Sequence, residues 1–360
     1  RGNNTDTKND DRSWCRYPNG VDTDKPSDWQ FKLSTKGESN GDASREQPQT
    51  ENTAGRGNLS VYFIDVGQGD VILIIYENST VMVDSGNRYS SVWSKINQTL
   101  HSLNVTSINL AIATHADSDH VGQFAELIRH FEIRQFWTNG EEGASQTWRE
   151  LNATIHNYGI PEHAARIGET YSMGDASMVV LNPSEPLIGD QNSDSVVVKL
   201  SYRNASLVLT GDADWRAERK MLNSSLCLDL HADVLKLAHH GSRYSSREDF
   251  LDAVSPKVAV ISCGYENPYG HPHNETLQRL IERNITYFRT DIHPELIDDI
   301  VATTDGYRLT IIQTSTGQRW SMDEAFLFWA MLIMLIILIL FLQYNSFSSV
   351  IVSHSHRSHG

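Results

Sequence analysis

The stretch Ala-Thr-His-Ala-Asp-Ser-Asp-His-Val-Gly at residues 113–122 contains four good metal ligands. His115, Asp117, Asp119 and His120 supply two imidazoles and two carboxylates, and a single cation could not easily use all four. A pair of cations could divide them, with His115 and Asp117 on one ion and Asp119 and His120 on the other. This spacing therefore predicts a metal site with two ions.

The residues on either side of this stretch indicate where it lies in a fold. Residues 108–113 form an apolar run that predicts a buried strand, so His115 is expected where a strand opens into a loop. The alternative is an acidic surface turn, in which Asp119 caps a helix that begins near Val121. The motifs found further along the chain favour the metal site.

Composition limits the classes of protein that fit this chain. Of 360 residues, 39% are hydrophobic, so the chain can bury a core in one large or two ordinary domains. The formal net charge of -15 repels nucleic acid on average, so such a substrate would need a local basic patch or screening by salt and metal. Cys15, Cys227 and Cys263 are too few and too scattered for a disulfide framework or a zinc–cysteine site.

An uncharged segment near the C-terminus predicts a membrane helix. Residues 325–342 carry no charge and are just numerous enough to cross a bilayer, and they lack the polar face of a core helix. Trp320 and Trp329 on one side and Tyr344 on the other suit the membrane interfaces. Because the tail 343–360 contains an arginine and no acid, we expect it to be cytoplasmic and the rest of the chain to be extracellular.

Ten Asn-x-Ser/Thr sequons precede this segment and agree with an extracellular, glycosylated surface. The alternative is a surface rich in Ser, Thr and Asn that carries no sugar. The sequons begin at Asn3, Asn58, Asn78, Asn97, Asn104, Asn152, Asn204, Asn223, Asn274 and Asn284.

The N-terminal segment, residues 1–57, differs in composition from the rest. It is polar, acidic and rich in Gly, Asn, Asp and Ser, so we expect it to be largely disordered. Residues 13–31 resemble the last strands of a lamin-tail-type domain, but only that end is present and no function follows from it. We expect one folded domain at residues 58–320.

Within this domain, period-2 apolar runs alternate with segments of helical spacing. Two similar halves of strands flanked by helices imply two β-sheets between helical layers. The expected strands are 59–65, 71–76, 80–84, 108–113, 133–137, 195–202, 206–210, 234–238, 258–262, 285–289 and 307–312, and the expected helices are 92–103, 122–130, 146–158, 247–254, 275–282 and one after Asp214.

Six motifs occur in a fixed order along residues 59–320. They are Asp-Val-Gly-Gln-Gly-Asp at 65–70, Val-Asp-Ser-Gly at 83–86, the stretch at 114–122, Thr-Gly-Asp at 210–212, His-His-Gly-Ser at 239–242 and Gly-His-Pro-His at 270–273. In this order they resemble the metallo-β-lactamase-fold domain of ComEC-type competence proteins. The resemblance implies an α/β four-layer αββα sandwich, a two-metal hydrolytic centre between the sheets and a DNA phosphodiester substrate. Competence proteins also carry a polytopic channel, which a chain with one membrane helix cannot form.

The resemblance assigns His115 and Asp117 to one metal and Asp119 and His120 to the other, and it makes Asp212 the bridge between them. The setting of Asp212 agrees, because a buried strand at 207–210 ends just before it. The alternative is that Asp212 caps a helix before Trp215.

One of His239 and His240 is expected to complete the site, because adjacent residues in an extended chain point to opposite sides. We favour His240 as the ligand, with the other histidine packing or holding a supporting hydrogen bond. Asp84 is expected to orient loops. Asp65, Gln68 and Asp70 belong to the structural motif at 65–70.

Departures from the pattern of β-lactam-cleaving enzymes change the expected metal. That pattern has His where this chain has Asp117, and residues 190–195 contain no His, where a third ligand would ordinarily fall. Oxygen ligands suit harder cations such as Mn²⁺ or Mg²⁺, so zinc is no longer the default. We expect two divalent ions, with Mn²⁺ or Zn²⁺ first and Mg²⁺ as a further option. A β-lactamase activity is not expected.

Further residues are candidates for catalysis and substrate binding. The candidates for catalysis are the ligand Asp119, His271 and His273. His271 or His273 could protonate the leaving oxygen or hold a phosphate. The alternative is that both are histidines of a surface loop. Three cations, Lys236, Arg243 and Arg247, and the hydroxyl of Ser242 are expected around the 239–242 turn. The alternative is ordinary surface charge.

The sequence therefore predicts a membrane-anchored extracellular two-metal hydrolase, a phosphodiesterase or nuclease acting on DNA, without the channel of the competence proteins. The alternatives are a non-catalytic surface binding or adhesion protein, and a hydrolase of phosphate esters in cell-wall polymers or lipids. The sequence points to no protein partner.

Overall fold

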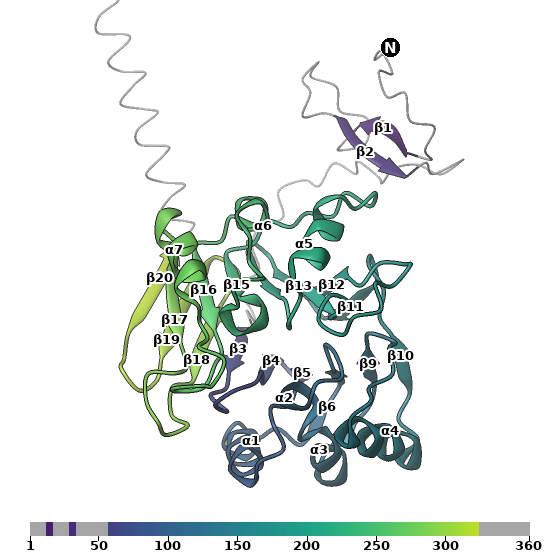
Figure 1. Cartoon of the computed structure of the whole chain (residues 1–360), viewed down its shortest axis with the longest axis vertical. Coiled ribbons are helices and arrows are strands. Elements are labelled where there is room, and N and C mark those ends of the chain that lie inside the picture. The colour runs from purple at the N-terminus through teal and green to yellow at the C-terminus, as the bar shows by residue number, and fades with distance from the viewer. Residues whose placement is uncertain (1–11, 17–28, 34–56, 324–360) are drawn as a thin grey trace, which may run out of the picture.

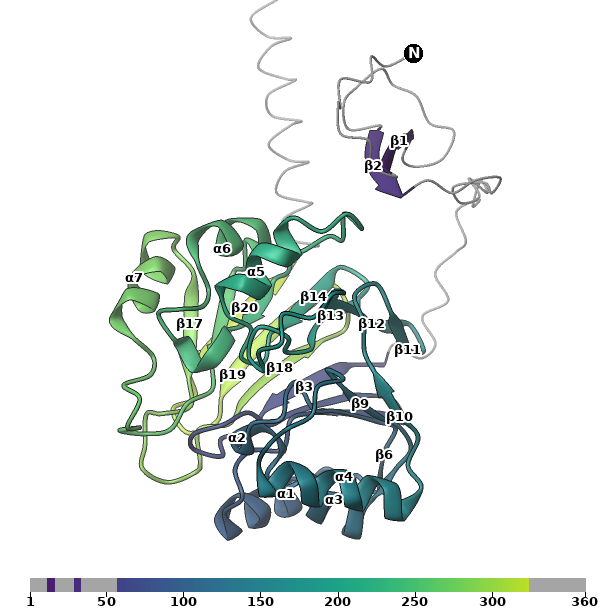
Figure 2. The ribbon, with the colours of Figure 1, turned by 45° about the vertical axis from the view of Figure 1, so that its right-hand side comes forward.

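The structure, a computed structural model, describes residues 12–16, 29–33 and 57–323. Two large β-sheets pack face to face, and helices cover the outer face of each (Figures 1 and 2). Apart from them, the short strands β1 (Arg12–Arg16) and β2 (Trp29–Leu33) form an antiparallel pair, and β6 (Ser107–Ile108) pairs with β8 (Glu132–Ile133).

The first sheet has nine strands. Antiparallel pairs run from β5 through β4, β3, β18 and β19 to β20, and the pair of β3 with β18 joins segments that are far apart in the chain. From β5 the sheet continues through β7, β9 and β10 as parallel strands. In spatial order the strands are β10 (Glu162–Ala164), β9 (Phe136–Thr138), β7 (Leu110–Ile112), β5 (Ser79–Val83), β4 (Ile72–Tyr76), β3 (Leu59–Phe63), β18 (Ile300–Thr304), β19 (Arg308–Gln313) and β20 (Arg319–Asp323).

The second sheet has seven strands. Antiparallel pairing from β11 to β14 gives way to parallel pairing from β14 to β17. The spatial order follows the chain: β11 (Thr170–Met173), β12 (Ala176–Asn182), β13 (Val197–Tyr202), β14 (Ala205–Leu209), β15 (Val234–Lys236), β16 (Val258–Ile261) and β17 (Thr286–Arg289).

The helices divide between the two outer faces (Figure 2). On the side of the first sheet lie α1 (Ser90–Ser102), α2 (Ser118–Val121), α3 (Phe124–His130) and α4 (Gln146–Tyr158). On the side of the second sheet lie α5 (Trp215–Leu222), α6 (Glu248–Val254) and α7 (Asn274–Glu282).

Three apolar layers hold these four layers together. The central one lies between the sheets and joins side chains such as Phe63 and Ile74 of the first sheet to Leu200 and Leu207 of the second. A second apolar layer packs α1, α3 and α4 on the first sheet, and a third packs α5, α6 and α7 on the second. The predicted αββα sandwich is therefore confirmed.

Some strands were missing from the sequence prediction. Residues 170–182 form the hairpin of β11 and β12, and β18 and β20 add two strands near the C-terminal end of the domain. The strands β11, β18 and β20 are rich in Ser, Thr or charged residues, so their local pattern is weak, whereas β12 is largely apolar and was overlooked. Their pairing with β13, β3 and β19 decides their conformation.

The expected membrane helix at 325–342 and the tail at 343–360 lie outside the described residues. Within the part of the chain that the structure describes, no helix is both long and apolar enough to span a bilayer. Of the sequon asparagines in the described residues, none is buried, and glycosylation stays a prediction.

Candidate metal centre

The predicted ligands lie on loops that leave strands of both sheets. His115 and Asp117 follow β7, and Asp119 and His120 lie in α2 just beyond. Asp212 follows β14, while His239 and His240 lie in a short 3₁₀ turn, η2 (Ala238–Gly241), after β15. Because β14 and β15 are parallel neighbours, their carboxyl ends meet at one edge of the second sheet.

Imidazole and carboxylate groups converge around Asp212. The Nε2 atom of His120 lies 3.3 Å from Oδ1 of Asp212, and the Nε2 atom of His240 lies 3.5 Å from Oδ2. The same Nε2 atom of His240 lies 3.5 Å from Oδ2 of Asp119. The carboxylate of Asp212 is thus contacted by His120 from the side of the first sheet and by His240 from the side of the second.

His115 and Asp117 form the more open side of this cluster. The Nε2 atom of His115 lies 3.5 Å from Oδ2 of Asp117, and its ring centre lies 4.2 Å from that of His120. The side chain of Asp117 is 55% exposed, whereas that of His115 is buried. The cluster therefore opens to solvent beside Asp117.

Among the described residues, four sets of three ligand atoms are close enough to share an ion, with the atoms of each set within 4.8 Å of one another. Two sets contain only predicted ligands: His115, His120 and Asp212, and Asp119, His120 and His240. The other two contain Asp70, once with Asp84 and His120 and once with Asp212 and His240. The buried Nε2 atoms of all three histidines and Oδ1 of Asp212 have no hydrogen-bond partner within the described residues. Buried polar atoms without partners need an explanation, and divalent cations fit this set of donors.

Hydrogen bonds on the far side of two imidazoles hold them toward the cluster. Asp84 Oδ2 lies 2.7 Å from Nδ1 of His120, and the same carboxylate accepts from the backbone and hydroxyl of Thr114. The carbonyl oxygen of Ser262 lies 2.9 Å from Nδ1 of His240. Such contacts leave Nε2 free and orient it. Asp84 thus lies where a residue that orients loops and rings is expected.

His239 and His240 differ from the sequence expectation. An extended chain would send their side chains to opposite sides, but β15 ends at Lys236 and both residues have left-handed backbone, with φ of 51° and 54°. Both rings therefore face Asp212, with Nε2 of His239 at 3.7 Å from Oδ2. Only His240 is buried and held through Nδ1, which is the arrangement of an oriented ligand.

Electrostatics at the cluster favour ionised carboxylates. Burial would raise the pKa of Asp212, but His240 and His120 hold it well below its ordinary value. Burial likewise opposes ionisation of Asp119, yet the hydrogen bond with His240 and the charge of His120 lower the pKa of Asp119. For His120 the carboxylates of Asp212 and Asp84 outweigh burial and raise the pKa. A cation at this position would replace the protons of the imidazoles.

Lys236 corrects one expectation from the sequence. Its side chain is fully buried, and its ammonium group forms a short ion pair with Oδ2 of Asp70 and donates to the carbonyl oxygen of Gly211 at 3.2 Å. It therefore does not face a substrate. The other oxygen of Asp70 lies 3.7 Å from Nδ1 of His240, so the pair lies directly beneath the cluster.

The remaining predicted substrate-binding residues lie around the same turn. The Ser242 hydroxyl is buried and accepts from the backbone of Tyr244. Arg243 is at the surface, where it pairs with Glu275 at 3.0 Å. Arg247 is exposed at the N-terminus of α6. Roles in substrate binding stay predictions for these three residues.

His271 and His273 lie on the loop that precedes α7. The ring of His271 lies 5.6 Å from that of His239 and 6.1 Å from that of His240. Burial and these two neighbouring histidines lower the pKa of His271 to about 4, so its imidazole is neutral near pH 7. His273 is further out, and its Nδ1 accepts from the backbone of Arg243 at 3.2 Å. His271 is thus the nearer of the two to the cluster.

The motif at 65–70 supports α2 from below. The backbone N–H of Asp70 donates to the carbonyl oxygen of Asp119, and a Cβ at Gly69, with φ of +132°, would lie 2.3 Å from that oxygen. Asp65 accepts hydrogen bonds from the backbone of Gly67 and Asp298, while burial raises its pKa to about 6. Only glycine at position 69, which has no Cβ, allows the close approach of this motif to the carbonyl oxygen of Asp119.

The loop at 190–195 lies beside the cluster and supplies no imidazole. The side-chain oxygen of Gln191 accepts from the backbone of Ala116 at 3.0 Å. Asp194 is buried and accepts from the backbone of Ile188 and Gly189. This loop therefore positions the motif at 113–122 by hydrogen bonds to its backbone.

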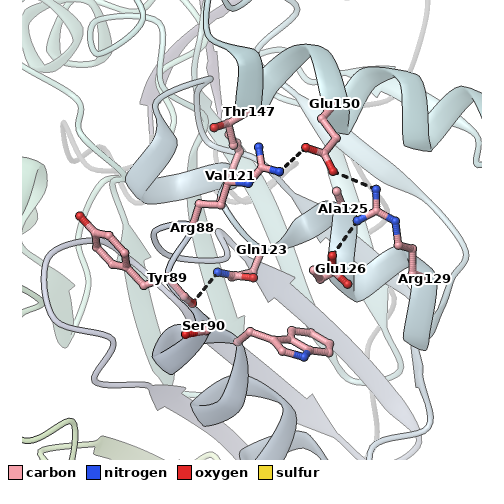
Figure 3. Close-up of a pocket in the computed structure, with 12 residues that line it drawn as sticks. Arg88, Tyr89, Ser90, Val121, Gln123, Ala125, Glu126, Arg129, Thr147 and Glu150 are labelled. Atoms are coloured by element: carbon pink, nitrogen blue, oxygen red, sulfur yellow. Dashed lines mark hydrogen bonds and ion pairs between the residues drawn. The ribbon is translucent and has the colours of Figure 1, made fainter.

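A pocket of about 250 Å³ lies behind α2, among α1, α3 and α4 (Figure 3). Its charged groups are already paired, because Glu150 contacts Arg88 at 2.5 Å and Arg129 at 2.9 Å, and Arg129 also contacts Glu126. Gln123 donates to the carbonyl oxygen of Tyr89. These contacts join the helices around the pocket, and the candidate ligands lie elsewhere.

The supporting roles of Thr114 and Ser262 were not recognised from the sequence, and Asp70 was assigned to a structural motif without its partner Lys236. One signal was present, since Lys236 interrupts an apolar strand and a buried lysine needs a partner. Nothing local identified that partner, because Asp70 is 166 positions away.

Comparison with known proteins agrees with this arrangement. A family model described as the metallo-beta-lactamase superfamily matches residues 64–265. ComE operon protein 3 of Bacillus subtilis is 31% identical over 247 residues, which is 64% of this chain and 32% of that protein. Competence protein ComA of Neisseria gonorrhoeae is 31% identical over 228 residues, 63% of this chain and 30% of that protein.

This chain thus spans about a third of the length of these curated relatives. Among solved structures, the metallo-beta-lactamase fold protein YhfI of Bacillus subtilis superposes with a TM-score of 0.45 at 11% identity and covers 73% of this chain and 100% of YhfI.

Proposed function

The chain belongs to the metallo-beta-lactamase superfamily, and on that premise we propose that it hydrolyses phosphodiester bonds, with DNA as its substrate. Membership of this superfamily indicates a metal-dependent hydrolase, and its homologues include competence proteins of the ComEC type. The proposal rests mainly on three buried imidazoles and the carboxylate of Asp212, which converge on one point. Within the described residues, the Nε2 atoms of these histidines and Oδ1 of Asp212 have no hydrogen-bond partner.

In this proposal His115 and Asp117 hold one divalent cation, Asp119, His120 and His240 hold the other, and Asp212 lies between them. Cations held there would make a hydroxide available at neutral pH and neutralise the charge that builds up on a phosphoryl group. Three of these six side chains are carboxylates, which supports Mn²⁺ or Mg²⁺ as well as Zn²⁺.

The surrounding residues orient the ligands and contact the substrate. Asp84 and the carbonyl oxygen of Ser262 hold the rings of His120 and His240, so the ligands are in place before a substrate binds. His271, a neutral imidazole near the cluster, would donate or accept a hydrogen bond on the substrate side. Arg243 and Arg247 are the surface cations of the adjoining turn.

A panel of substrates tests the proposal. Purified protein should contain close to two divalent ions per chain by elemental analysis. It should cleave DNA or a chromogenic phosphodiester with Mn²⁺, Zn²⁺ or Mg²⁺. Absence of stoichiometric metal together with no hydrolysis of any of these substrates would refute it.

We also propose that the domain is extracellular and is anchored by residues 325–342. The uncharged segment and the sequons support this arrangement, since nine of the ten sequon asparagines lie in the described residues and none of them is buried. Protease added to intact cells should then remove the domain. A domain that is protected until the cells are lysed would show the opposite orientation.

A further inference from the structure

The loop between β16 and α7 encloses a second space beside the candidate metal centre. Together with residues from 65–68 and 293–296, residues 264–268 of this loop line a cavity of about 410 Å³, which we call the side pocket. This volume lies within the range of small-molecule sites. The metal cluster itself uses none of the residues that line the pocket.

Three contacts place the side pocket next to the cluster. The loop at 65–68 continues into Asp70, whose backbone donates to the carbonyl oxygen of Asp119. Gly264 lies two residues after Ser262, whose carbonyl oxygen contacts His240. The amide of Asn267 donates to the carbonyl oxygen of His271 at 2.6 Å. A chain whose phosphate lies at the cluster would therefore have its neighbouring groups within reach of the pocket.

Two exposed tyrosines lie on the loop that forms the pocket. Tyr265 lines the pocket and is 45% exposed, and Tyr269 is 62% exposed. The ring of Tyr269 stacks on His271 with 22° between planes and 5.7 Å between ring centres. From His240 through His271 to Tyr269, rings lie side by side from the cluster to the surface. Flat aromatic surfaces exposed in this way bind nucleobases by stacking.

Hydrogen bonds of Asn267 and Gln68 hold the same loop in place. Asn267 donates to the carbonyl oxygens of Gly264 and His271 and accepts from the backbone of His271. Gln68 accepts from the backbone of Gly264, while its Nε2 atom has no hydrogen-bond partner within residues 57–323. These hydrogen bonds hold the loop that carries both tyrosines.

Charges around the cluster argue against a duplex as the preferred substrate. Binding of double-stranded DNA depends on Lys and Arg contacts with phosphates. Here Lys236 is buried against Asp70, Arg243 pairs with Glu275 and Arg216 pairs with Asp190, so that Arg247 is left as an exposed cation at the start of α6. The chain also carries a net charge of -15. Stacking on aromatic side chains adds binding energy through the faces of the bases, which a single strand leaves open.

We propose that Tyr265, Tyr269 and the side pocket form a base-stacking subsite, which selects single-stranded nucleic acid and holds a base next to the bond to be cleaved. This inference rests on the proposed phosphodiesterase function and names its substrate class. Tyr265 and Tyr269 are specificity-determining residues in it, and the metal ligands remain as assigned above.

Cleavage of three matched DNAs tests the subsite. The metal-loaded protein is given a labelled single strand, the same strand without bases, and the duplex. The single strand should be cleaved with a kcat/KM at least about fivefold above that of the abasic strand and above that of the duplex. Tyr265→Ala and Tyr269→Ala should each reduce the preference for bases, whereas Tyr265→Phe and Tyr269→Phe should retain it.

Tyr158→Ala is the matched control, because Tyr158 is an equally exposed tyrosine at the end of α4. A preference for the duplex would overturn the inference, and so would alanine variants that behave like the control. If none of the DNAs is cleaved, the proposed function fails. Fluorescence anisotropy then decides the subsite separately: tighter binding of the base-containing strand that both alanine variants lose supports it, and equal binding of both strands overturns it.

Discussion

Asp212 is the residue on which the candidate centre depends most. It is buried, it lies within 3.7 Å of His120, His239 and His240, and one of its oxygens has no hydrogen-bond partner among the described residues. Asp119, in α2, lies 3.5 Å from one of these three imidazoles, that of His240. Removal of Asp212 should therefore affect both proposed ions, whereas removal of Asp119 should affect one.

We predict that Asp212→Ala lowers the metal content from about two ions to one or none, and that Asp119→Ala retains one ion. Both variants should lose turnover by about a hundredfold or more, because ligands of this kind act through the metal. Elemental analysis and circular dichroism measure metal content and fold. Asp175→Ala, at a carboxylate that is 69% exposed, is the control. Full activity of either ligand variant with two bound ions would contradict the assignment.

A second residue-scale prediction concerns Glu218, which is buried in α5 and accepts hydrogen bonds from the backbone of Ser246 and Arg247. Burial raises the pKa of Glu218 from 4.5 to about 7. Ionisation is thus disfavoured in the folded state. The contribution of this group to stability is fully present below pH 4.5 and is lost as the pH rises through 7, by about 3 kcal/mol in total.

Glu218→Gln should remove this part of the pH dependence, so the free energy of unfolding should change less between pH 5 and pH 8 than in the natural protein. Urea denaturation at several pH values gives the comparison. Glu132→Gln changes a carboxylate that is 65% exposed and should leave the profile as it is. An unchanged profile in Glu218→Gln would show that another group causes the pH dependence.

At the scale of elements, β15 and the loop after β3 are joined by the buried pair of Lys236 and Asp70. Lys236 ends β15 of the second sheet, Asp70 lies in the loop between β3 and β4 of the first, and both side chains are almost entirely buried. Beneath the cluster the pair therefore fixes the separation of the two sheets. Loss of one partner would leave the other charge buried without compensation, which typically costs roughly 3–5 kcal/mol of stability. We expect a loss of about this size here.

We predict that Lys236→Met lowers the free energy of unfolding by about 3 kcal/mol or more, and that adding Asp70→Asn restores part of the loss. A double-mutant cycle in urea isolates the coupling between the two residues. Arg134→Met breaks an exposed pair with Glu132 and should cost less than about 1 kcal/mol. If Lys236→Met and Arg134→Met lowered the free energy of unfolding equally, the buried pair would contribute no more than a surface pair.

For the whole molecule, the chain order of the first sheet determines which truncations are tolerated. The first strand of the domain, β3, pairs with β18, which comes more than two hundred residues later. Ile300 and Ala302 of β18 and Leu309 of β19 belong to the apolar layer between the sheets. A chain that lacks these strands would expose one edge of β3 and part of the central core.

We therefore predict that residues 57–323 unfold cooperatively in urea as an isolated domain, whereas residues 57–297 do not form a stable fold. Circular dichroism and urea titration distinguish the two. A shortened chain that retains a cooperative transition would show that β18 to β20 are an addition to an independently stable sheet.

Features that depend on neighbouring residues could be predicted from the sequence. The spacing of His115, Asp117, Asp119 and His120 lies within one short segment, and the strand before it is apolar, so both the candidate ligands and the αββα architecture were predicted. Period-2 and helical patterns are local because side-chain direction repeats every two or 3.6 residues. Strands with weak patterns, such as β18 and β20, were missed for the same reason.

Contacts between distant segments were decided only by the tertiary structure. Lys236 was expected to face substrate and instead meets Asp70, and the left-handed backbone of His239 and His240 turns both rings toward Asp212. Neither result follows from local pattern, because each depends on which loops the packing of the two sheets brings together. Burial then gives these contacts their strength, since a charge removed from water must find its partner inside the fold.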